Sequence, residues 1–226
     1  MALIAPSLLA ADFARLGEAL QRIKEAGASM VHVAVMDGHF VPDLSVGQPV
    51  IRSLRKATDL VLDIHLLVER PERFAAEFLD AGADRLAVQV ESTLQLPQLL
   101  GLIRARGAKA GVALDPATPV DAVSEVWGDI DFLTIMASGP SLKAVDYRPR
   151  TVVKLQQAYR ARQEGRHNFA LQVEGGGVGF ENLDELVGAG ADILVVGSDI
   201  FQDGDPRARL QKMIRLAATS GQISSV

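Results

Sequence analysis

Short apolar, β-branched runs alternate along this chain with segments that repeat apolar residues at helical spacing, and this alternation constrains the fold most. In one helical segment Phe13, Leu16, Leu20 and Ile23 recur at three- and four-residue steps. Strands are predicted for Leu3–Pro6, Met30–Met36, Val61–Leu67, Arg85–Val90, Lys109–Leu114, Phe132–Met136, Phe169–Val173 and Ile193–Val196. Helices are predicted for Asp12–Ala26, Glu72–Ala81, Leu96–Arg106, Val120–Val126, Arg150–Gln163, Leu183–Ala189 and Pro206–Ala218.

The dipeptide Gly-Ala recurs at Gly27, Gly82, Gly107 and Gly190, each time between a predicted helix and the next strand. Glycine at that position supplies the left-handed cap that ends a helix. Eight strands that alternate with helices predict a parallel sheet, and closing that sheet gives a (β/α)8 TIM barrel. No linker or low-complexity tract interrupts the 226 residues, so we expect a single α/β domain over residues 1–226.

Charge and composition exclude several classes of protein. The net charge is −5, whereas a nucleic-acid-binding protein has a basic footprint. The chain contains no cysteine, which excludes disulfides and thiolate metal sites. Its apolar start has no basic residues before Asp12 interrupts it, unlike a signal peptide or a membrane span. We therefore expect a soluble cytoplasmic protein with no nucleic-acid or membrane partner.

Two histidines and a glutamate are predicted to lie at one end of the barrel. His32 is in the second predicted strand, His65 is in the third, and Glu174 comes just after the seventh. The active site of such barrels lies at the carboxyl ends of the strands. Two imidazoles and a carboxylate there suit a metal site with open positions for substrate. A single histidine in an apolar strand is more often a packed, hydrogen-bonded core residue, so the metal hypothesis depends on all three residues together.

Two glycine turns predict a phosphate site. Gly175, Gly176 and Gly177 follow the seventh strand, and Gly197 and Ser198 follow the eighth. Glycines let backbone N–H groups approach an anion closely, and a short helix that begins near Ser198 would direct its positive end there. Loops after strands 7 and 8 are the usual phosphate-binding loops of these barrels.

Other polar residues carry weaker predictions. Ser7 ends the first strand and either touches a substrate hydroxyl or caps the segment before Asp12. Asp37 precedes a glycine and is expected to brace its own turn. Lys143 and Arg148 lie in the long connection after strand six, where a solvated loop charge is the default interpretation. Poor candidates for metal ligation are His39 and His167, which lie in polar loops.

Several motifs, in order, resemble the ribulose-phosphate 3-epimerase family. They are IAPSLLAADFARL, VMDGHFVP, LDIHLL with ERPERF after it, AGAD, GAKAGVALDPATP and VVGSDIF, and they cover nearly the whole chain. The resemblance implies a (β/α)8 barrel that interconverts ribulose 5-phosphate and xylulose 5-phosphate. It also implies that two aspartates and two histidines hold a divalent metal, and that the aspartates act as acid and base on opposite faces of C3.

Carried over by position, the two histidines of the family are His32 and His65, and the substrate-touching serine is Ser7. Of the two histidines, His65 is also expected to contact substrate. The first aspartate is replaced by Ala34, which removes one metal ligand and one proton carrier. The second is Glu174, the remaining candidate for the catalytic base. The glycine-rich loop of the family after the sixth strand is replaced by residues 137–147, ASGPSLKAVDY.

Three functions are therefore open. The first is a sugar-phosphate epimerase that abstracts the C3 proton of a ketopentose phosphate, with impaired or altered chemistry. The second is a different isomerisation of a phosphosugar, and the third is a phosphosugar-binding protein without catalysis. A divalent metal such as Zn, Fe, Mn or Co is expected to bind weakly through His32, His65 and Glu174, because Ala34 supplies no ligand. The resemblance also implies a homo-oligomer.

Overall fold

The computed structural model describes residues 2–139, 150–202 and 204–223. Within these ranges eight parallel strands form one sheet in the order β1-β8-β7-β6-β5-β4-β3-β2. The strands are β1 Leu3–Pro6, β2 Met30–Met36, β3 Val61–Leu67, β4 Arg85–Gln89, β5 Lys109–Leu114, β6 Phe132–Met136, β7 Ala170–Glu174 and β8 Ile193–Val196. A parallel bridge between Ser7 and His32 links the two outer strands. The predicted (β/α)8 TIM barrel is confirmed.

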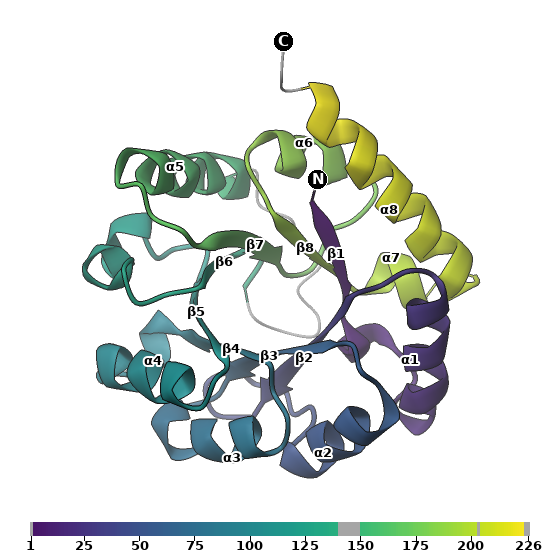
Figure 1. The fold of residues 1–226 in the computed structure, drawn as a ribbon, viewed down its shortest axis with the longest axis horizontal. Coiled ribbons are helices and arrows are strands. Elements are labelled where there is room, and N and C mark those ends of the chain that lie inside the picture. The colour runs from purple at the N-terminus through teal and green to yellow at the C-terminus, as the bar shows by residue number, and fades with distance from the viewer. Residues whose placement is uncertain (1, 140–149, 203, 224–226) are drawn as a thin grey trace.

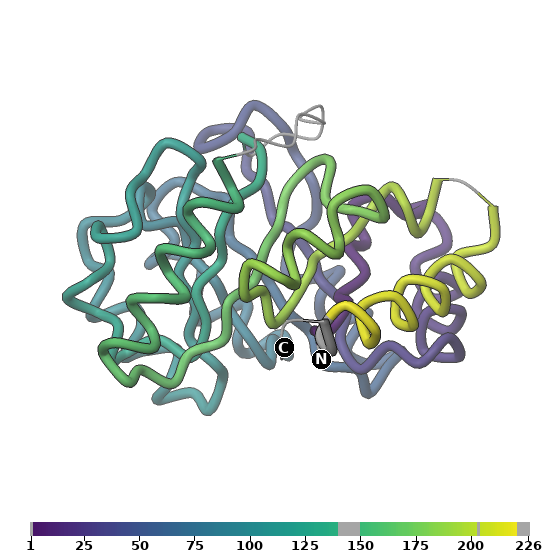
Figure 2. Tube along the Cα trace, turned by 90° about the horizontal axis from the view of Figure 1, so that it is seen from above, coloured from purple at the N-terminus to yellow at the C-terminus, as the bar shows by residue number. Residues whose placement is uncertain are grey.

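Helices surround the strands, and the last of them lies beside α1, which completes the ring (Figures 1 and 2). The α-helices are α1 Leu16–Glu25, α2 Gln48–Ala57, α3 Ala75–Asp80, α4 Leu96–Ala105, α5 Arg150–Glu164, α6 Leu183–Gly188, α7 Ser198–Phe201 and α8 Pro206–Ile223. The 3₁₀ turns are η1 Leu8–Ala10, η2 Phe13–Arg15, η3 Pro71–Arg73, η4 Val90–Ser92 and η5 Val120–Val126. Among the described helices, none is long and apolar enough to cross a membrane.

Most sequence predictions of elements hold, with some corrections. The helices predicted for Asp12–Ala26 and Glu72–Ala81 each begin as a 3₁₀ turn, so that α1 starts at Leu16 and α3 at Ala75. The predicted helix at Val120–Val126 is a 3₁₀ segment. The helix α2 was not predicted, although its proline at the first turn is a common start signal. The fourth strand ends one residue earlier than predicted, at Gln89, and the seventh is shifted by one residue and ends on Glu174 itself. Glu174 therefore belongs to the strand rather than to the turn after it.

The helix ends behave as the Gly-Ala pattern predicts. Gly27, Gly82, Gly107 and Gly190 have φ angles of 100°, 111°, 80° and 107°. Residues other than glycine rarely adopt this left-handed backbone region, because their Cβ atom clashes there, whereas glycine adopts it without penalty. The four glycines thus end a helix and turn the chain into the next strand.

Apolar layers lie on both sides of the strands. The larger core packs between the strands and the helices. Inside the barrel, Ala5, Met30, Ile193 and Val195 form one cluster, and Ala34, Met36, Val41 and Leu67 form another. Since side chains alternate along a strand, Met30, His32 and Ala34 share one face of β2. His32 therefore lies between the two inner apolar clusters.

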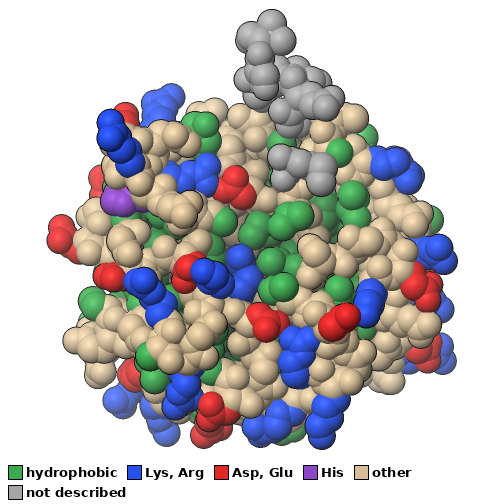
Figure 3. Space-filling view, viewed as in Figure 1, with side chains coloured by type: hydrophobic (Ala, Val, Ile, Leu, Met, Phe, Trp, Pro, Cys, Tyr) green, Lys and Arg blue, Asp and Glu red, His purple; other side chains and the backbone are tan. Residues whose placement is uncertain are grey.

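Charged side chains of both signs are interspersed on the face of the molecule shown in Figure 3. That face shows no field of a single sign of the kind that binds nucleic acid.

Candidate active site

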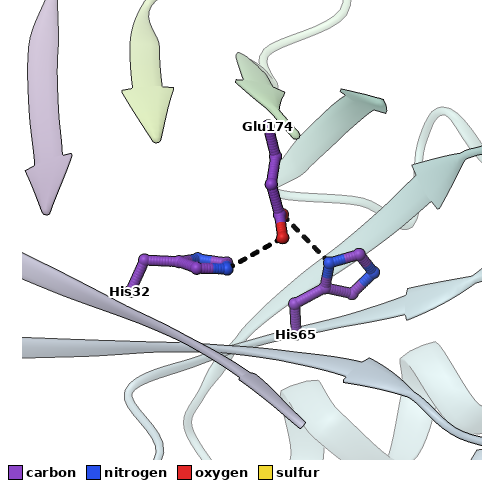
Figure 4. A group of neighbouring side chains, drawn as sticks. All are labelled: His32, His65 and Glu174. Carbon is purple, nitrogen blue, oxygen red and sulfur yellow. Dashed lines mark hydrogen bonds and ion pairs between the residues drawn. The ribbon is translucent and has the colours of Figure 1, made fainter. Parts of the chain in front are cut away.

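The structure brings His32, His65 and Glu174 together, as predicted. Figure 4 shows the Glu174 side chain descending from β7 between the histidines of β2 and β3. Its Oε1 lies 3.0 Å from His32 Nε2, and its Oε2 lies 2.9 Å from His65 Nδ1. One carboxylate therefore contacts both imidazoles, which is possible because all three side chains point into the barrel.

The strands position these residues through their register. Ala34 on β2 pairs with His65 on β3, and both point inward. His32 and His65 are 0% exposed and Glu174 is 6% exposed, so water has little access to the group. The ring centroids of the two histidines lie 6.3 Å apart. The result is a rigid, dry arrangement in which a carboxylate and two imidazoles face one another.

Mutual attraction determines the charges of the group. Burial by itself would lower the pKa of His32, but the nearby Glu174 carboxylate and the hydrogen bond to Asp63 raise it to about 10. Burial would raise the pKa of Glu174, but the facing histidines hold it far below its usual value. Without a metal, Glu174 is thus a carboxylate and His32 is an imidazolium at neutral pH.

The three residues fit a divalent metal. One ligand atom from each of His32, His65 and Glu174 lies within 4.8 Å of the others. A mixed set of two imidazole nitrogens and one carboxylate suits Zn²⁺ or a related ion, with an open coordination position. His32 must lose its proton to ligate, because a metal binds the neutral imidazole.

A pocket opens above Glu174. Its described lining comes from the ends of β1, β2, β3, β6, β7 and β8 and includes Ser7, Ala34 and Glu174. Among these lining residues Glu174 is the only carboxylate. Ala34, 3% exposed, presents a methyl group where the resemblance places an aspartate. The described lining of the pocket therefore contains one carboxylate, that of Glu174, rather than two.

The two glycine turns line the same pocket. Gly175, Gly176 and Gly177 lie on one side, and Gly197 and Ser198 lie near Ser7. Ser198 begins α7, so its N–H has no acceptor within that helix. The Gly176 N–H instead donates to Ser138 Oγ at 2.8 Å. An anion in this pocket would meet the backbone of both turns, with the Gly176 amide already engaged.

Gly175 allows the close approach of two strand ends. Its φ is 128°, and a Cβ there would lie 2.9 Å from both the N and Oγ atoms of Ser138. This glycine therefore has a packing role, whether or not its N–H binds an anion.

The weaker predictions have separate outcomes. Ser7 lines the pocket and its hydroxyl does not cap the following turn, whereas Asp12 accepts from Ala14 N at 2.9 Å and does. Asp37 braces its turn as expected, because its Oδ1 accepts from the His39 and Phe40 amides at 2.8 and 3.0 Å. Lys143, Arg148 and most of the 137–147 loop lie outside the described residues.

Neither Asp37 nor Glu91 replaces the missing aspartate within the described pocket. The Asp37 carboxylate is used by backbone amides, including that of Glu69. Glu91 accepts from Asp115 N at 2.9 Å and from the Thr118 hydroxyl. The poor ligand candidates also stay apart from the site: His39 bonds the Asp37 carbonyl, and His167 packs against Trp127 and Phe169.

Four further polar residues were missed by the sequence interpretation. Asp63, Arg85 and Gln172 form hydrogen bonds beneath His32, and Ser138 bonds Gly176. Asp63 and Gln172 stand two residues before His65 and Glu174, so the strand period places them on the same inner face. A polar residue at that spacing in an apolar strand was the available signal.

Comparison with known proteins gives one consistent family. The model of the ribulose-phosphate 3 epimerase family matches residues 3–201. Ribulose-phosphate 3-epimerase from Bacillus subtilis is 36% identical over 211 residues, which cover 93% of this chain and 97% of that protein. The proteins of the same name from Treponema pallidum and Escherichia coli are 40% and 38% identical, over 88% and 93% of this chain and 90% and 94% of theirs.

More distant solved structures share the fold. A tryptophan synthase α-subunit from Pyrococcus furiosus superposes with a TM-score of 0.70 at 17% identity, covering 96% of this chain and 98% of that one. Orotidine 5′-monophosphate decarboxylase from Sulfolobus solfataricus gives 0.68 at 11% identity, covering 97% and 99%. At these identities the likeness concerns the barrel alone.

Proposed function

This chain belongs to the ribulose-phosphate 3-epimerase family, and we propose that it epimerises a ketopentose phosphate at C3 with Glu174 as its one carboxylate base. D-Ribulose 5-phosphate and D-xylulose 5-phosphate are the proposed pair. The observation that supports this most strongly is the position of Glu174, which lines the pocket and at the same time contacts both buried histidines. Its relatives are named as epimerases, which supports an isomerase activity.

Binding is proposed to begin with the phosphate. The turns at Gly175–Gly177 and Gly197–Ser198 would accept it through backbone N–H groups, and the Ser7 hydroxyl would meet a substrate hydroxyl. His65 would lie below the reacting carbons, behind Glu174. With its phosphate at the glycine turns and its reacting carbons near Glu174, the substrate would present C3 to the carboxylate. Orientation of this kind lowers the entropic part of the activation barrier.

Glu174 would then take the proton from C3, which is acidic because it lies beside the ketone. The electrons move into the C2 carbonyl, and the product of this step is an enediolate. In the metal-free protein His32 and His65 donate hydrogen bonds to Glu174 and hold its oxygens in place. A divalent metal held by His32, His65 and Glu174 would supply positive charge that stabilises the enediolate oxygens.

Inversion requires a proton on the opposite face of C3. Ala34 has no proton to give, and the described pocket lining contains no second carboxylate. We therefore propose that this proton comes from water and that its delivery limits the rate. A positioned acid or base contributes about 10²–10⁴-fold, so the reaction should be slower by a factor of that order.

The lone carboxylate also supports a second candidate, a one-base isomerisation. In that reaction Glu174 would take a proton from C1 instead of C3 and return it to C2 on the same face of the 1,2-enediolate, which converts the ketose into an aldose phosphate. No group on the opposite face is needed for that reaction.

One experiment separates these reactions. Ribulose 5-phosphate is incubated with protein and Zn²⁺, Mn²⁺ or Co²⁺ in D₂O, and products are followed by NMR. The proposal predicts slow formation of xylulose 5-phosphate with deuterium at C3. An aldose phosphate would support the one-base isomerisation, and saturable binding without any hydrogen exchange would support a binding protein and contradict catalysis.

The proposed assembly is a homo-oligomer that acts in the cytoplasm on a small phosphorylated sugar. Light scattering of the purified protein tests the oligomer, with a mass above 24.1 kDa as the expected result.

A further inference from the structure

A second polar cluster lies beneath the candidate site, nearer the amino-terminal ends of the strands. It consists of Asp63 on β3, Arg85 on β4 and Gln172 on β7. Arg85 Nε donates to Asp63 Oδ1 at 2.8 Å, and Arg85 Nη2 donates to Gln172 Oε1 at 2.8 Å. Gln172 Nε2 donates to Asp63 Oδ2 at 3.0 Å, and that oxygen also receives His32 Nδ1 at 2.8 Å. The cluster therefore ends on a residue of the candidate metal site.

The donor and the acceptor of each hydrogen bond in the cluster are determined by the chemistry of the side chains. A guanidinium can only donate, so Gln172 must turn its carbonyl oxygen toward Arg85 and its NH₂ toward Asp63. The ionised Asp63 can only accept, so His32 must carry a proton on Nδ1. The other ring nitrogen, Nε2, is then the one that faces Glu174.

The Arg85 side chain is held in place by packing against an aromatic ring and by buried acceptors. Its guanidinium carbon lies 3.8 Å from the centroid of the Phe132 ring, and its side chain is 11% exposed. A Cβ at Gly111 would lie 2.2 Å from the Phe132 ring, so the absence of a side chain there leaves room for the ring. Asp63 and Gln172 are 1% and 0% exposed. A buried arginine that stacks on a ring and bonds two acceptors has little freedom to move.

We infer that Arg85 and Gln172 are positioning residues for the reaction: through Asp63 they hold the His32 ring with Nδ1 hydrogen-bonded and Nε2 directed at Glu174. Residues that orient a metal-ligating histidine in this way usually change metal affinity about 10–100-fold when they are replaced. The inference about the ring stands on these contacts alone. Its consequence for metal affinity rests on the proposed function.

A purely structural ion pair would look different, and the chain provides one for comparison. Arg162 pairs with Asp192 and stacks on Tyr159 at 5.2 Å, with a side chain that is 13% exposed. It resembles Arg85 in burial and partners, but its contacts are to Asp192, the Phe169 carbonyl and Tyr159 rather than to the histidine group. The matched variants are Arg85→Lys and Arg162→Lys. Lysine keeps the charge but cannot make the two forked bonds together.

The first readout is NMR of protein labelled with ¹⁵N-histidine. In wild type the Nδ1 proton of His32 should give a downfield signal that exchanges slowly with water. Arg85→Lys should broaden or lose that signal, while Arg162→Lys should keep it. An unchanged signal in Arg85→Lys would overturn the inference. If that variant does not fold, Gln172→Met is used in its place, with the same two outcomes.

The second readout is the zinc dissociation constant, measured by competition with a chelator, beside the melting temperature. Arg85→Lys should weaken zinc binding about 10–100-fold and Arg162→Lys less than twofold, even if both lower the melting temperature. Equal zinc affinity in both variants would contradict the positioning role. Absence of zinc binding in wild type would instead contradict the proposed metal site, and the NMR signal would still test the inference.

Discussion

The pocket has two ends that are built in different ways. At one end the Glu174 carboxylate lines the pocket and contacts His32 and His65, which lie fully buried outside the lining, and buried hydrogen bonds fix all three side chains. At the other end Gly175–Gly177 and Gly197–Ser198 present mainly backbone. Chemistry at the first end depends on which side chain is present. Binding at the second depends on which backbone shape is allowed.

This difference explains where divergence within the family can occur. Ala34, where the resemblance implies an aspartate, pairs with His65 in the sheet, so the strand pairing does not require a reactive group at this position. Replacing a glycine of left-handed φ would disturb the backbone itself. We therefore expect substitutions at the side-chain end to change reactivity while the fold is kept, and substitutions at the glycine end to change the backbone.

The largest effect is expected at the side-chain end. Glu174→Gln keeps the length of the residue but removes the base and the negative charge, so kcat should fall by about 10²–10⁴-fold. The affinity for zinc should also fall, because one of the three ligands is lost. The measurement is the initial rate of xylulose 5-phosphate formation together with metal content.

Glu181→Gln is the matched control, because Glu181 is exposed in the connection after the same strand. Its rate should stay within twofold of wild type. A Glu174→Gln rate close to wild type would remove Glu174 from the proposed mechanism.

The next effect is the pH dependence of zinc binding. The Glu174 carboxylate and Asp63, against the opposing effect of burial, raise the pKa of His32 to about 10, so zinc must displace a proton. Affinity should increase about tenfold per pH unit between pH 6 and 8. A titration by calorimetry in two buffers of different ionisation enthalpy reports the released proton. Affinity that does not change with pH would show that His32 is neutral before the metal arrives.

The same charges set the stability of the metal-free protein. Because the pKa of His32 is higher folded than unfolded, its contribution is fully present below about pH 6.5 and is lost as the pH rises through about 10. The pKa values of Glu174 and Asp63 are lowered by the facing cations, against burial, so their contributions are lost in acid. Urea midpoints of metal-free protein should therefore decline on both sides of neutral pH. A midpoint that rises between pH 8 and 10 would contradict these charge assignments.

The smallest effect is expected at the glycine end. Gly175→Ala forces a Cβ against Ser138 and strains a φ of 128°, at a cost of about 1–3 kcal/mol in the free energy of unfolding. The KM for the sugar phosphate should rise while kcat changes less, since Glu174 is untouched by the substitution. Denaturation and steady-state kinetics measure the two quantities.

Gly188→Ala is the control for that substitution. Gly188 lies in α6, and nothing stands within 4 Å of an added Cβ, so alanine should stabilise by about 0.5–1 kcal/mol. If Gly175→Ala behaved like Gly188→Ala, the close approach of the β6 and β7 ends would not matter for the site.

Residues that repeat a regular spacing could be predicted from the sequence. His32, His65 and Glu174 were brought to one place because strands alternate their side chains and parallel strands share one carboxyl end. The Gly-Ala pattern fixed the ends of four helices for an equally local reason. In each case the cause lies within a few residues of the feature.

The supporting cluster could not be assembled in this way. Arg85 begins a strand, where a charged residue is usually solvated, and its partners lie 22 and 87 positions away. Asp63 is its register partner on the neighbouring strand β3, but only the closed barrel brings Gln172 across from β7. The bond from Gly176 to Ser138 has a more local origin, because each residue stands two positions after the strand partners Met136 and Glu174 on the adjacent β6 and β7.

The central claim is that one carboxylate serves a pocket for which the resemblance to the family implies two. Its most direct test is the rate of xylulose 5-phosphate formation by wild type, by Ala34→Asp and by the Bacillus subtilis relative, with metal content determined in parallel. Ala34 lines the pocket beside His65, so the new carboxylate would restore a ligand and a proton carrier. We predict that wild type is slower than the relative by about 10²-fold or more and that Ala34→Asp gains at least about tenfold in both rate and zinc affinity. Wild-type activity within about tenfold of the relative, with no gain from Ala34→Asp, would contradict the claim.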